Sequence, residues 1–286
     1  MNLVELIDTQ KAHLDKNGIW TTQPELSSEE LLSKQRWEGI YDFGVEELKK
    51  QRVAFDRDKL NDHLRFILPS FNFGGKTVYL EIGCGPSHIG DYLQSERGCK
   101  FIGLDFNYKA LVVLKTYFDK KGYKDYLLIH ADVKDIPLKD ESVDFIYGGG
   151  VIEHVKDTSG VLRELSRVLK TGGVSFNTVP AFNLFWLTRF YKSIPEVKGL
   201  RPVLDFVHLK LLRGRVLGKN FGYELSFTLE GVKKFHREAG FAEVGAGPFA
   251  FHPNPEKLKL ALLRALYFGL SQSALFCPFH FVRARK

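Results

Sequence analysis

The sequence has few cysteines, no long apolar run and no repeated segment. Its 286 residues contain three cysteines, Cys84, Cys99 and Cys277, which are too few and too scattered for a disulfide scaffold or a zinc site. No stretch approaches the ~20 apolar residues that a membrane-spanning helix needs. With 44% hydrophobic and 26% charged residues, the composition excludes a disordered or collagen-like chain. We therefore expect a globular, cytoplasmic protein without a metal site.

The net charge of +7 is unevenly distributed along the chain. Residues 1–70 carry 10 basic and 13 acidic side chains, residues 71–180 carry 14 of each, and residues 181–286 carry 17 basic and 7 acidic ones. The positive excess therefore lies in the C-terminal third, where it indicates a local anionic partner or a solvated face. Acidic Glu5, Asp8 and Asp15 occupy the place of an apolar leader, so we expect no secretory signal peptide.

The first 70 residues show helical spacing of apolar side chains. The stretches are Leu3, Ile7 and Leu14; the capping-box pair Ser27 and Glu30 before Leu31, Leu32 and Trp37; and Leu60, Leu64 and Ile67, which Pro69 ends. We interpret residues 1–70 as an N-terminal helical cap.

Strand-like and helical patterns alternate from residue 76 onward. Predicted strands cover residues 78–82, 99–106, 126–129, 143–147, 174–179, 243–247 and 279–283. Predicted helices cover 86–97, 110–118, a stretch between Asp157 and Gly172, a stretch between Thr228 and Gly240, and 256–270. This alternation predicts an α/β fold with a Rossmann-like, mostly parallel seven-stranded sheet, helices on both faces and an antiparallel last strand. Ligands bind beyond the carboxyl ends of the strands in such sheets.

The most informative motif is the glycine turn in residues 80–87, Leu-Glu-Ile-Gly-Cys-Gly-Pro-Ser. A strand leads into a turn that a ligand can approach closely, and the helix that follows points its N–H groups at the ligand. Other nucleotide folds share this arrangement. A dinucleotide fingerprint would need glycine in place of His88, and a P-loop would need Gly-Lys-Ser/Thr after the turn, so neither pattern fits.

Polar or small residues follow the next three strands. Asp105 ends the second strand, where a carboxylate can accept both ribose hydroxyls. Asp132 follows the third strand, where it can accept an exocyclic amine such as that of adenine. Three glycines, residues 148–150, end the fourth strand and again permit close approach. Each strand end therefore suits one part of an adenosine-bearing ligand.

This ordered set resembles the class I S-adenosylmethionine-dependent methyltransferases, in particular the small-molecule group that includes the quinone-biosynthesis enzymes. The resemblance covers residues 70–180 and, more loosely, 226–286. It implies S-adenosyl-L-methionine as the cofactor and a methyltransferase domain over residues 71–286. The cofactor-binding residues it implies are Glu81, Gly83, Cys84, Gly85, Asp105, Phe106, Asp132, Val133 and Gly148. The one departure is Ser87, where the family often has a third glycine.

The same resemblance gives each of these positions a role. Glu81 orients the glycine loop, Gly83 and Gly85 admit the methionine part, and Asp105 binds the ribose. Asp132 binds the adenine amine, Val133 lies near the ring, and Gly148 lies near the methionine end.

Histidines are the candidate bases for methyl transfer to a hydroxyl or an acidic carbon. His154 follows the fourth strand and is our candidate catalytic residue; the alternative is that it only bonds the backbone of a loop. We interpret Glu153 as a solvated or loop-orienting acid. His208 and His252 lie in the variable part, where a structural role is the alternative to contact with substrate.

Residues 181–225 combine aromatic and basic side chains and form the expected substrate-covering insertion. Between residues 181 and 220 they carry eight basic and two acidic groups. This pattern is compatible with an anionic membrane surface, with single-stranded nucleic acid, or with a lid whose basic face is solvated. The helix predicted at 256–270 has a wide apolar face, which we expect to pack against the lid or the sheet.

We predict a methyltransferase for a small, lipophilic or anionic acceptor, with oxygen or carbon as the methylated atom. DNA is excluded as a partner because the chain lacks an Asp/Asn-Pro-Pro-aromatic run and a cysteine in the place of a cytosine nucleophile. RNA is disfavoured because no RNA-binding module is appended. The alternatives are an RNA or protein methyltransferase and a non-catalytic cofactor-binding scaffold. The sequence leaves open peripheral contact of 181–225 with a membrane, and the oligomeric state.

Overall fold

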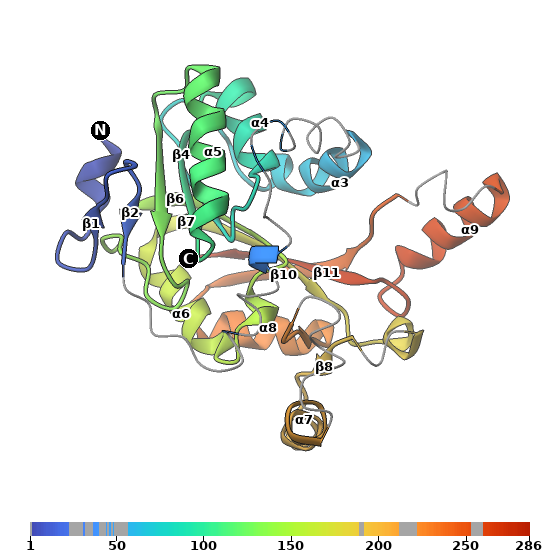
Figure 1. Ribbon diagram of the computed structural model, residues 1–286. Coiled ribbons are helices and arrows are strands. Elements are labelled where there is room, and N and C mark those ends of the chain that lie inside the picture. Colours follow the sequence, from blue (N-terminus) through green and yellow to red (C-terminus); the bar gives the residue numbers. More distant parts are fainter. Residues whose placement is uncertain are drawn as a thin grey trace.

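A mixed β-sheet forms the centre of the molecule (Figure 1). The computed structural model describes residues 2–22, 31, 37–39, 44, 46, 48, 57–188, 192–211, 222–252 and 260–286. Within them, the order across the sheet is β1 (His13–Leu14), β2 (Trp20–Thr21), β5 (Tyr126–His130), β4 (Lys100–Asp105), β3 (Val78–Ile82), β6 (Val143–Gly149), β7 (Leu169–Pro180), β11 (Phe279–Arg285) and β10 (Glu243–Phe249).

The strand directions confirm the predicted fold class. The ladder from β2 through β5, β4, β3 and β6 to β7 is parallel throughout, whereas β11 runs antiparallel to both β7 and β10. The parallel strands are buried on both faces, which is why they are short runs of valine, leucine, isoleucine and aromatic residues. The carboxyl ends of β3 to β6 consequently meet at one edge of the sheet.

Helices cover both faces of this sheet (Figure 1). On one side lie α3 (Arg57–Ile67), α4 (His88–Arg97) and α5 (Tyr108–Lys121), and on the other lie α6 (Thr158–Val168) and α8 (Leu229–Glu238). Alternate residues of each strand supply the two apolar cores. Tyr79 and Phe101 pack with α4 and α5, whereas Leu80 and Ile102 belong to the core on the α6 side.

The sheet of the described residues has nine strands, so the prediction of seven was wrong in number. The seven expected strands are present, and β1 and β2 extend the sheet beyond β5. The helix expected from Leu3 to Leu14 is replaced by a short 3-10 turn, η1 (Leu3–Leu6), followed by these strands. A turn at Asp15, whose carboxylate accepts the N–H groups of Asn17 and Ile19, reverses the chain and buries Ile19. The expected cap around Ser27, Glu30 and Leu32 lies outside the described residues.

The other elements form the edges of the cofactor region and the C-terminal third. They are η2 (Leu68–Ser70), η3 (Ile152–His154), η4 (Leu184–Thr188), β8 (Ile194–Pro195), α7 (Leu200–Asp205), the π-helical turn η5 (Phe206–Leu211), β9 (Leu225–Ser226) and α9 (Ala261–Ser271). Strands β8 and β9 pair in a separate two-stranded sheet. The insertion predicted at 181–225 is thus built from short elements in its described parts, while Arg189, Phe190, Tyr191, Arg213, Arg215 and Lys219 lie outside them.

Helix α9 extends away from the sheet (Figure 1). The prediction that its apolar face packs against the lid or sheet was wrong for the described part, because Leu262 is 81% exposed and Leu266 57% exposed. Phe268 is the half-buried member of the helix and stacks on His252 with a ring-centroid distance of 4.2 Å. In the part of the chain that the structure describes, α9 and the other helices are too short or too polar to traverse a bilayer.

Candidate functional site

The glycine turn after β3 is held from below by Glu81. Oε2 of Glu81 accepts hydrogen bonds from the Tyr79 hydroxyl at 2.9 Å, the Ser87 hydroxyl at 2.9 Å and the Gly90 N–H at 3.0 Å. Ser87 has a left-handed backbone, with φ of 47°, a conformation that favours glycine. The bond from its hydroxyl to Glu81 offers a reason why serine is accepted at this position. Glu81 thus orients the loop from beneath and does not line the cavity described below.

Asp105 joins the end of β4 to the same turn. Its Oδ2 accepts the Gly85 N–H and its Oδ1 accepts the Asn107 N–H, both at 2.8 Å. The side chain is 4% exposed, and burial raises the pKa of Asp105 to about 6. The Phe106 N–H donates to the same carboxylate, which leaves part of its acceptor capacity for a ligand. Asp105 can therefore fix the glycine turn and accept a hydroxyl group at the same time.

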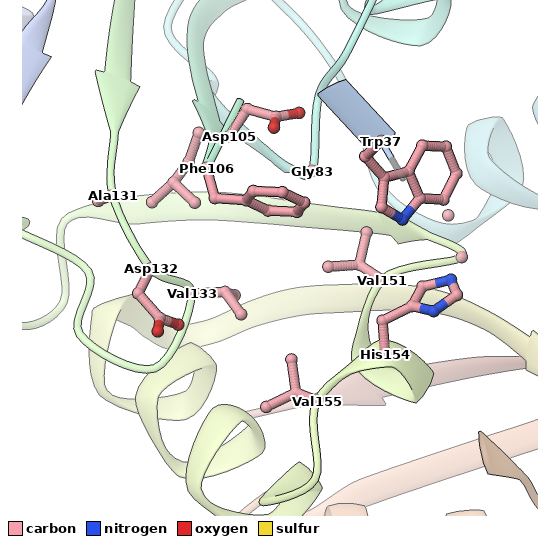
Figure 2. Close-up of a pocket in the computed structure, with 13 residues that line it drawn as sticks. Trp37, Gly83, Asp105, Phe106, Ala131, Asp132, Val133, Val151, His154 and Val155 are labelled. Carbon is pink, nitrogen blue, oxygen red and sulfur yellow. The ribbon is translucent and has the colours of Figure 1, made fainter. Parts of the chain in front are cut away.

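A cavity enclosing about 830 Å³ of open space lies beyond the carboxyl ends of β3, β4, β5 and β6. Figure 2 shows Asp105 at its upper end, Asp132 at the lower left, and Trp37 and His154 on the right. Its lining consists of Trp37, Gly83, Leu104, Asp105, Phe106, Ala131, Asp132, Val133, Gly149, Gly150, Val151, His154 and Val155. The polar groups of this lining are few and lie at separate points, as in small-molecule sites.

Six of the residues named from the sequence line this cavity, and four do not. Gly83, Asp105, Phe106, Asp132, Val133 and His154 contribute to the wall. Glu81, Cys84 and Gly85 lie behind it, and burial raises the pKa of the Cys84 thiol well above its ordinary value, which makes it a packing residue. Gly148 lies inside β6, where an added Cβ would come within 2.5 Å of Asn177 Oδ1. The next two residues, Gly149 and Gly150, line the cavity in its place.

Gly83 and Asp132 line the cavity just after the ends of β3 and β5. A Cβ on Gly83 would lie 2.6 Å from a methyl carbon of Val151, and its φ of 56° is also a left-handed conformation. Asp132 Oδ1 accepts the Lys134 N–H at 2.8 Å, and Oδ2 lies 3.3 Å from the Lys134 ammonium group. These contacts fix the position of the Asp132 carboxylate at the cavity wall.

Trp37 is the lining residue that the sequence analysis missed most completely. It lies more than forty residues before the glycine turn, and its backbone carbonyl accepts the side-chain N–H of Asn107 at 3.3 Å. Its ring meets His154 edge to face, with the centroids 5.7 Å apart. No local sequence pattern marks such a residue, because a tertiary contact with the end of β4 brings it to the site.

A second cavity, enclosing about 860 Å³, adjoins the first and shares Trp37, Gly149, Gly150 and His154 with it. Its other lining residues are Glu153, Pro180, Ala181, Phe185, Trp186, Lys192, Ser193, Glu224, Pro278 and Phe279. Most of these belong to the C-terminal third. His154 and Trp37 therefore lie at the junction of the two cavities.

His154 has a defined tautomer. Its Nδ1 lies 2.6 Å from the carbonyl oxygen of Tyr223, and because a carbonyl can only accept, Nδ1 carries the hydrogen. Burial lowers the pKa of His154 to about 4, so the ring is neutral and Nε2 carries a lone pair. The ring can therefore accept a proton at the junction of the cavities.

Glu153 is buried, in contrast to its interpretation as a solvated acid. It is 2% exposed, it lines the second cavity, and its Oε2 has no hydrogen-bond partner among the described residues. Burial, together with the charge of Glu224, raises the pKa of Glu153 well above its ordinary value. A buried polar oxygen without a hydrogen-bond partner destabilises the fold, and a bound ligand could supply the missing partner of Glu153.

His208 and His252 lie away from both cavities. His252 bonds Asp62 through its backbone N–H at 2.7 Å and through its ring, and so ties the segment before α9 to α3. His208 is buried within η5. Among the residues that the structure describes, His, Cys, Asp and Glu side chains form no group that could hold a metal ion.

Comparison with known proteins agrees with this geometry. A family model described as a methyltransferase domain matches residues 80–176. The demethylmenaquinone methyltransferase of Geobacillus kaustophilus is 29% identical over 223 residues, covering 70% of this chain and 90% of its own length. That of Bacillus pumilus is 28% identical over 157 residues, covering 53% of this chain, and the match spans only 62% of its own length.

A solved structure extends the likeness to the fold. Phosphoethanolamine N-methyltransferase 2 of Haemonchus contortus, in complex with S-adenosyl-L-methionine, has a TM-score of 0.59 at 15% identity, over 93% of this chain and 61% of that one. Residues 80–176 match a methyltransferase domain, and the findings support a class I S-adenosylmethionine-dependent methyltransferase that is distantly homologous to the demethylmenaquinone methyltransferases.

The cofactor of this family is S-adenosyl-L-methionine, and the residues present fit it. Asp105 keeps acceptor capacity for a hydroxyl, Asp132 offers an acceptor for an amine, and the apolar Phe106, Val133 and Val155 can flank a ring. At Gly83 the backbone itself forms the wall, because a Cβ there would collide with Val151.

Proposed function

We propose that this protein transfers a methyl group from S-adenosyl-L-methionine to a small, lipophilic or anionic acceptor, at oxygen or carbon. The observation that carries the proposal is the pair of adjoining cavities with His154 at their junction. The first cavity suits the cofactor, and the second has room for a separate molecule. Methyl transfer requires the two bound molecules to meet, and cavities that share lining residues bring their occupants close together.

The chemistry asks little of the protein besides alignment and a base. When bound, S-adenosyl-L-methionine supplies an electrophilic sulfonium methyl group. His154 takes the proton from an acceptor hydroxyl or acidic carbon at Nε2, while its Nδ1–H remains bonded to the Tyr223 carbonyl. Trp37 and Val151 restrict water at the junction. Burial keeps His154 neutral, so the base is ready at neutral pH.

The second cavity supports the choice of acceptor class. Trp37, Phe185, Trp186 and Phe279 offer aromatic surface, and Lys192 adds a cation at the same cavity. The relatives named as demethylmenaquinone methyltransferases favour a lipophilic, quinone-like acceptor and methylation at carbon. We propose that Glu153 hydrogen-bonds a polar group of this acceptor through its unpartnered Oε2.

We place the protein in the cytoplasm, where its three buried cysteines, Cys84, Cys99 and Cys277, stay as free thiols. Residues 181–225 cover the acceptor, and their basic character permits peripheral contact with an anionic membrane. The N-terminal segment that carries Trp37 completes the cap over the site.

Two measurements test the proposal. Calorimetry should show binding of S-adenosyl-L-methionine and of its demethylated product. Incubation with methyl-labelled cofactor and a cell extract, separated into lipid, aqueous small-molecule, RNA and protein fractions, should place the label in a small molecule that mass spectrometry then identifies. Label in RNA or protein would overturn the acceptor class. Cofactor binding without any transfer would overturn the activity and favour a scaffold.

A further inference from the structure

The His154 ring is held by a part of the chain outside the central sheet. Its Nδ1–H donates to the backbone carbonyl of Tyr223 at 2.6 Å. Tyr223 is 1% exposed and lies two residues before β9, which pairs with β8. The orientation of the ring therefore depends on where the small sheet of β8 and β9 places the Tyr223 backbone.

Arg201 is bonded to both sides of this contact. It belongs to α7, which lies beyond the central sheet beside β8 (Figure 1). Nη2 of Arg201 donates to the Tyr223 hydroxyl at 3.3 Å and to the backbone carbonyl of Lys156 at 2.7 Å. Lys156 lies two residues after His154 in the chain. One side chain thus joins the segment that carries the His154 ring to the residue whose carbonyl accepts the hydrogen of that ring.

Two carboxylates fix the guanidinium group of Arg201. Nη1 pairs with Glu196, the residue after β8, and Nε lies 3.6 Å from Asp205 Oδ2. Asp205 Oδ1 in turn accepts the hydrogen of the Tyr223 hydroxyl at 3.1 Å. The guanidinium is planar, so these partners determine the direction of its remaining N–H groups. The Arg201 side chain is 19% exposed, and charge-assisted bonds that are partly withdrawn from water hold their geometry well.

We propose that Arg201 is a positioning residue for methyl transfer, which acts through Tyr223 and Lys156 to keep the hydrogen of His154 on Nδ1 and the lone pair on Nε2. The inference rests on the proposed role of His154 as the base. A neutral imidazole carries one hydrogen, and the bond made by one ring nitrogen decides where it resides. If the Tyr223 carbonyl moves away, the hydrogen can transfer to Nε2, and this nitrogen then has no lone pair for the proton of the acceptor.

The test compares Arg201→Lys and Tyr223→Phe in the whole chain. Lysine keeps the positive charge but lacks the planar group that reaches both carboxylates, the Tyr223 hydroxyl and the Lys156 carbonyl together. Phenylalanine removes the hydroxyl and keeps the backbone carbonyl. Nitrogen-15 NMR of protein labelled at histidine, with the His154 signal assigned by its loss in His154→Ala, shows which ring nitrogen carries the hydrogen.

We expect His154 of the parent protein to carry its hydrogen on Nδ1. Arg201→Lys should give a mixture of the two neutral forms, and Tyr223→Phe a smaller change in the same direction, because Arg201 then keeps its bond to Lys156. The initial rate of label transfer from methyl-labelled S-adenosyl-L-methionine into the small-molecule fraction of a cell extract should fall about tenfold in Arg201→Lys, since the base is misaligned. Cofactor affinity, measured by calorimetry, should stay unchanged.

The matched control is Arg167→Lys. Arg167 likewise bonds two backbone carbonyls and two carboxylates, those of Ile136, Leu138, Asp140 and Glu164. It is 28% exposed and lies outside the lining of both cavities. This variant should lower the thermal midpoint about as much as Arg201→Lys does, and it should leave the His154 signal and the rate as they are in the parent protein.

Three results would overturn the inference. They are a parent ring with its hydrogen on Nε2, an unchanged His154 signal in Arg201→Lys, and an equal loss of rate in the two arginine variants. Each would leave Arg201 with a role in stability alone, and the proposed methyl transfer would stand. His154→Ala at the parent rate would refute the base itself, so the failure of the proposed function is recognised separately.

Discussion

The first cavity is lined mostly by residues 71–180 and the second mostly by residues 181–286, and these two regions differ in structure. The first region has no net charge, regular strands and a cavity wall built from strand ends. The second has a net charge of +10, several two- to six-residue elements between Leu184 and Ser226, and exposed apolar side chains. The regular strand ends of residues 71–180 suit a cofactor of fixed shape. Residues 181–286 can differ between family members with different acceptors, while the cofactor region stays the same.

We expect the largest effect on activity from removing His154, the proposed base between the cofactor cavity and the acceptor cavity. The His154→Ala variant should lower the rate of methyl transfer by about 10²–10⁴-fold, because it removes Nε2, the proposed proton acceptor at the junction of the cavities. Cofactor affinity should change little. The measurement is the initial rate of label transfer into the identified acceptor, with exposed His13→Ala as the control that keeps its rate. A variant as fast as the parent protein would leave His154 a structural role only.

A second test weakens the regular region alone. Asp105→Ala removes the carboxylate that accepts the N–H groups of Gly85 and Asn107, along with any bond to the ribose. Cofactor affinity should fall about 100-fold by calorimetry, the equivalent of about 3 kcal/mol. Exposed Asp140→Ala, which removes a carboxylate far from the cavity, is the control. Unchanged affinity would break the assignment of the cofactor site.

A third test separates acceptor from cofactor. Glu153→Ala should raise the KM for the acceptor about tenfold, since one buried hydrogen bond is lost, and should leave the affinity for the cofactor unchanged. Glu153→Gln keeps a donor and an acceptor at the same place and should recover much of the loss. If both variants weaken cofactor binding instead, Glu153 orients the loop of β6 and does not touch the acceptor.

The smallest expected effect concerns the stability of the fold, to which buried histidines from both regions of the chain contribute. Burial lowers the pKa of His63, His154, His236 and His280 to about 4. Since the unfolded chain then binds more protons below pH ~6.5, the free energy of unfolding should fall as the pH drops from ~6.5 to ~4, by on the order of 1 kcal/mol per histidine. Asp105, with a pKa of about 6, acts in the opposite sense between pH ~4 and ~6.

Thermal midpoints across this pH range provide the measurement. His236 is the clearest contributor, because Nδ1 donates to the Val232 carbonyl at 2.8 Å and a proton on Nε2 would face the Asn177 amide. In His236→Gln the decline should be shallower than in the parent protein. A midpoint that rises on acidification would show that Asp105 outweighs the histidines.

The sequence predicted the cofactor region well because its signals are local. The glycine turn and the acids Asp105 and Asp132 follow successive strand runs along the chain, and the parallel sheet brings these strand ends to one edge. Trp37 and the hairpin of β1 and β2 were missed because long-range pairing determines them. The exposure of α9 was missed because an apolar helix pattern is identical whether its partner is protein, lipid or absent.

The short strands β1 and β2 have a consequence for how the protein can be shortened. They form a hairpin in which β2 pairs with Ile129 and His130 of β5, and the Thr22 N–H donates to the His130 carbonyl at 3.0 Å. At the other edge, β10 carries Glu243 and Pro248, which discourage pairing with a further strand. A protein trimmed to begin at α3 would keep the whole glycine turn but expose β5 as a template for other chains. We expect it to aggregate, measurable as light scattering on concentration, and to lose Trp37 with the removed segment.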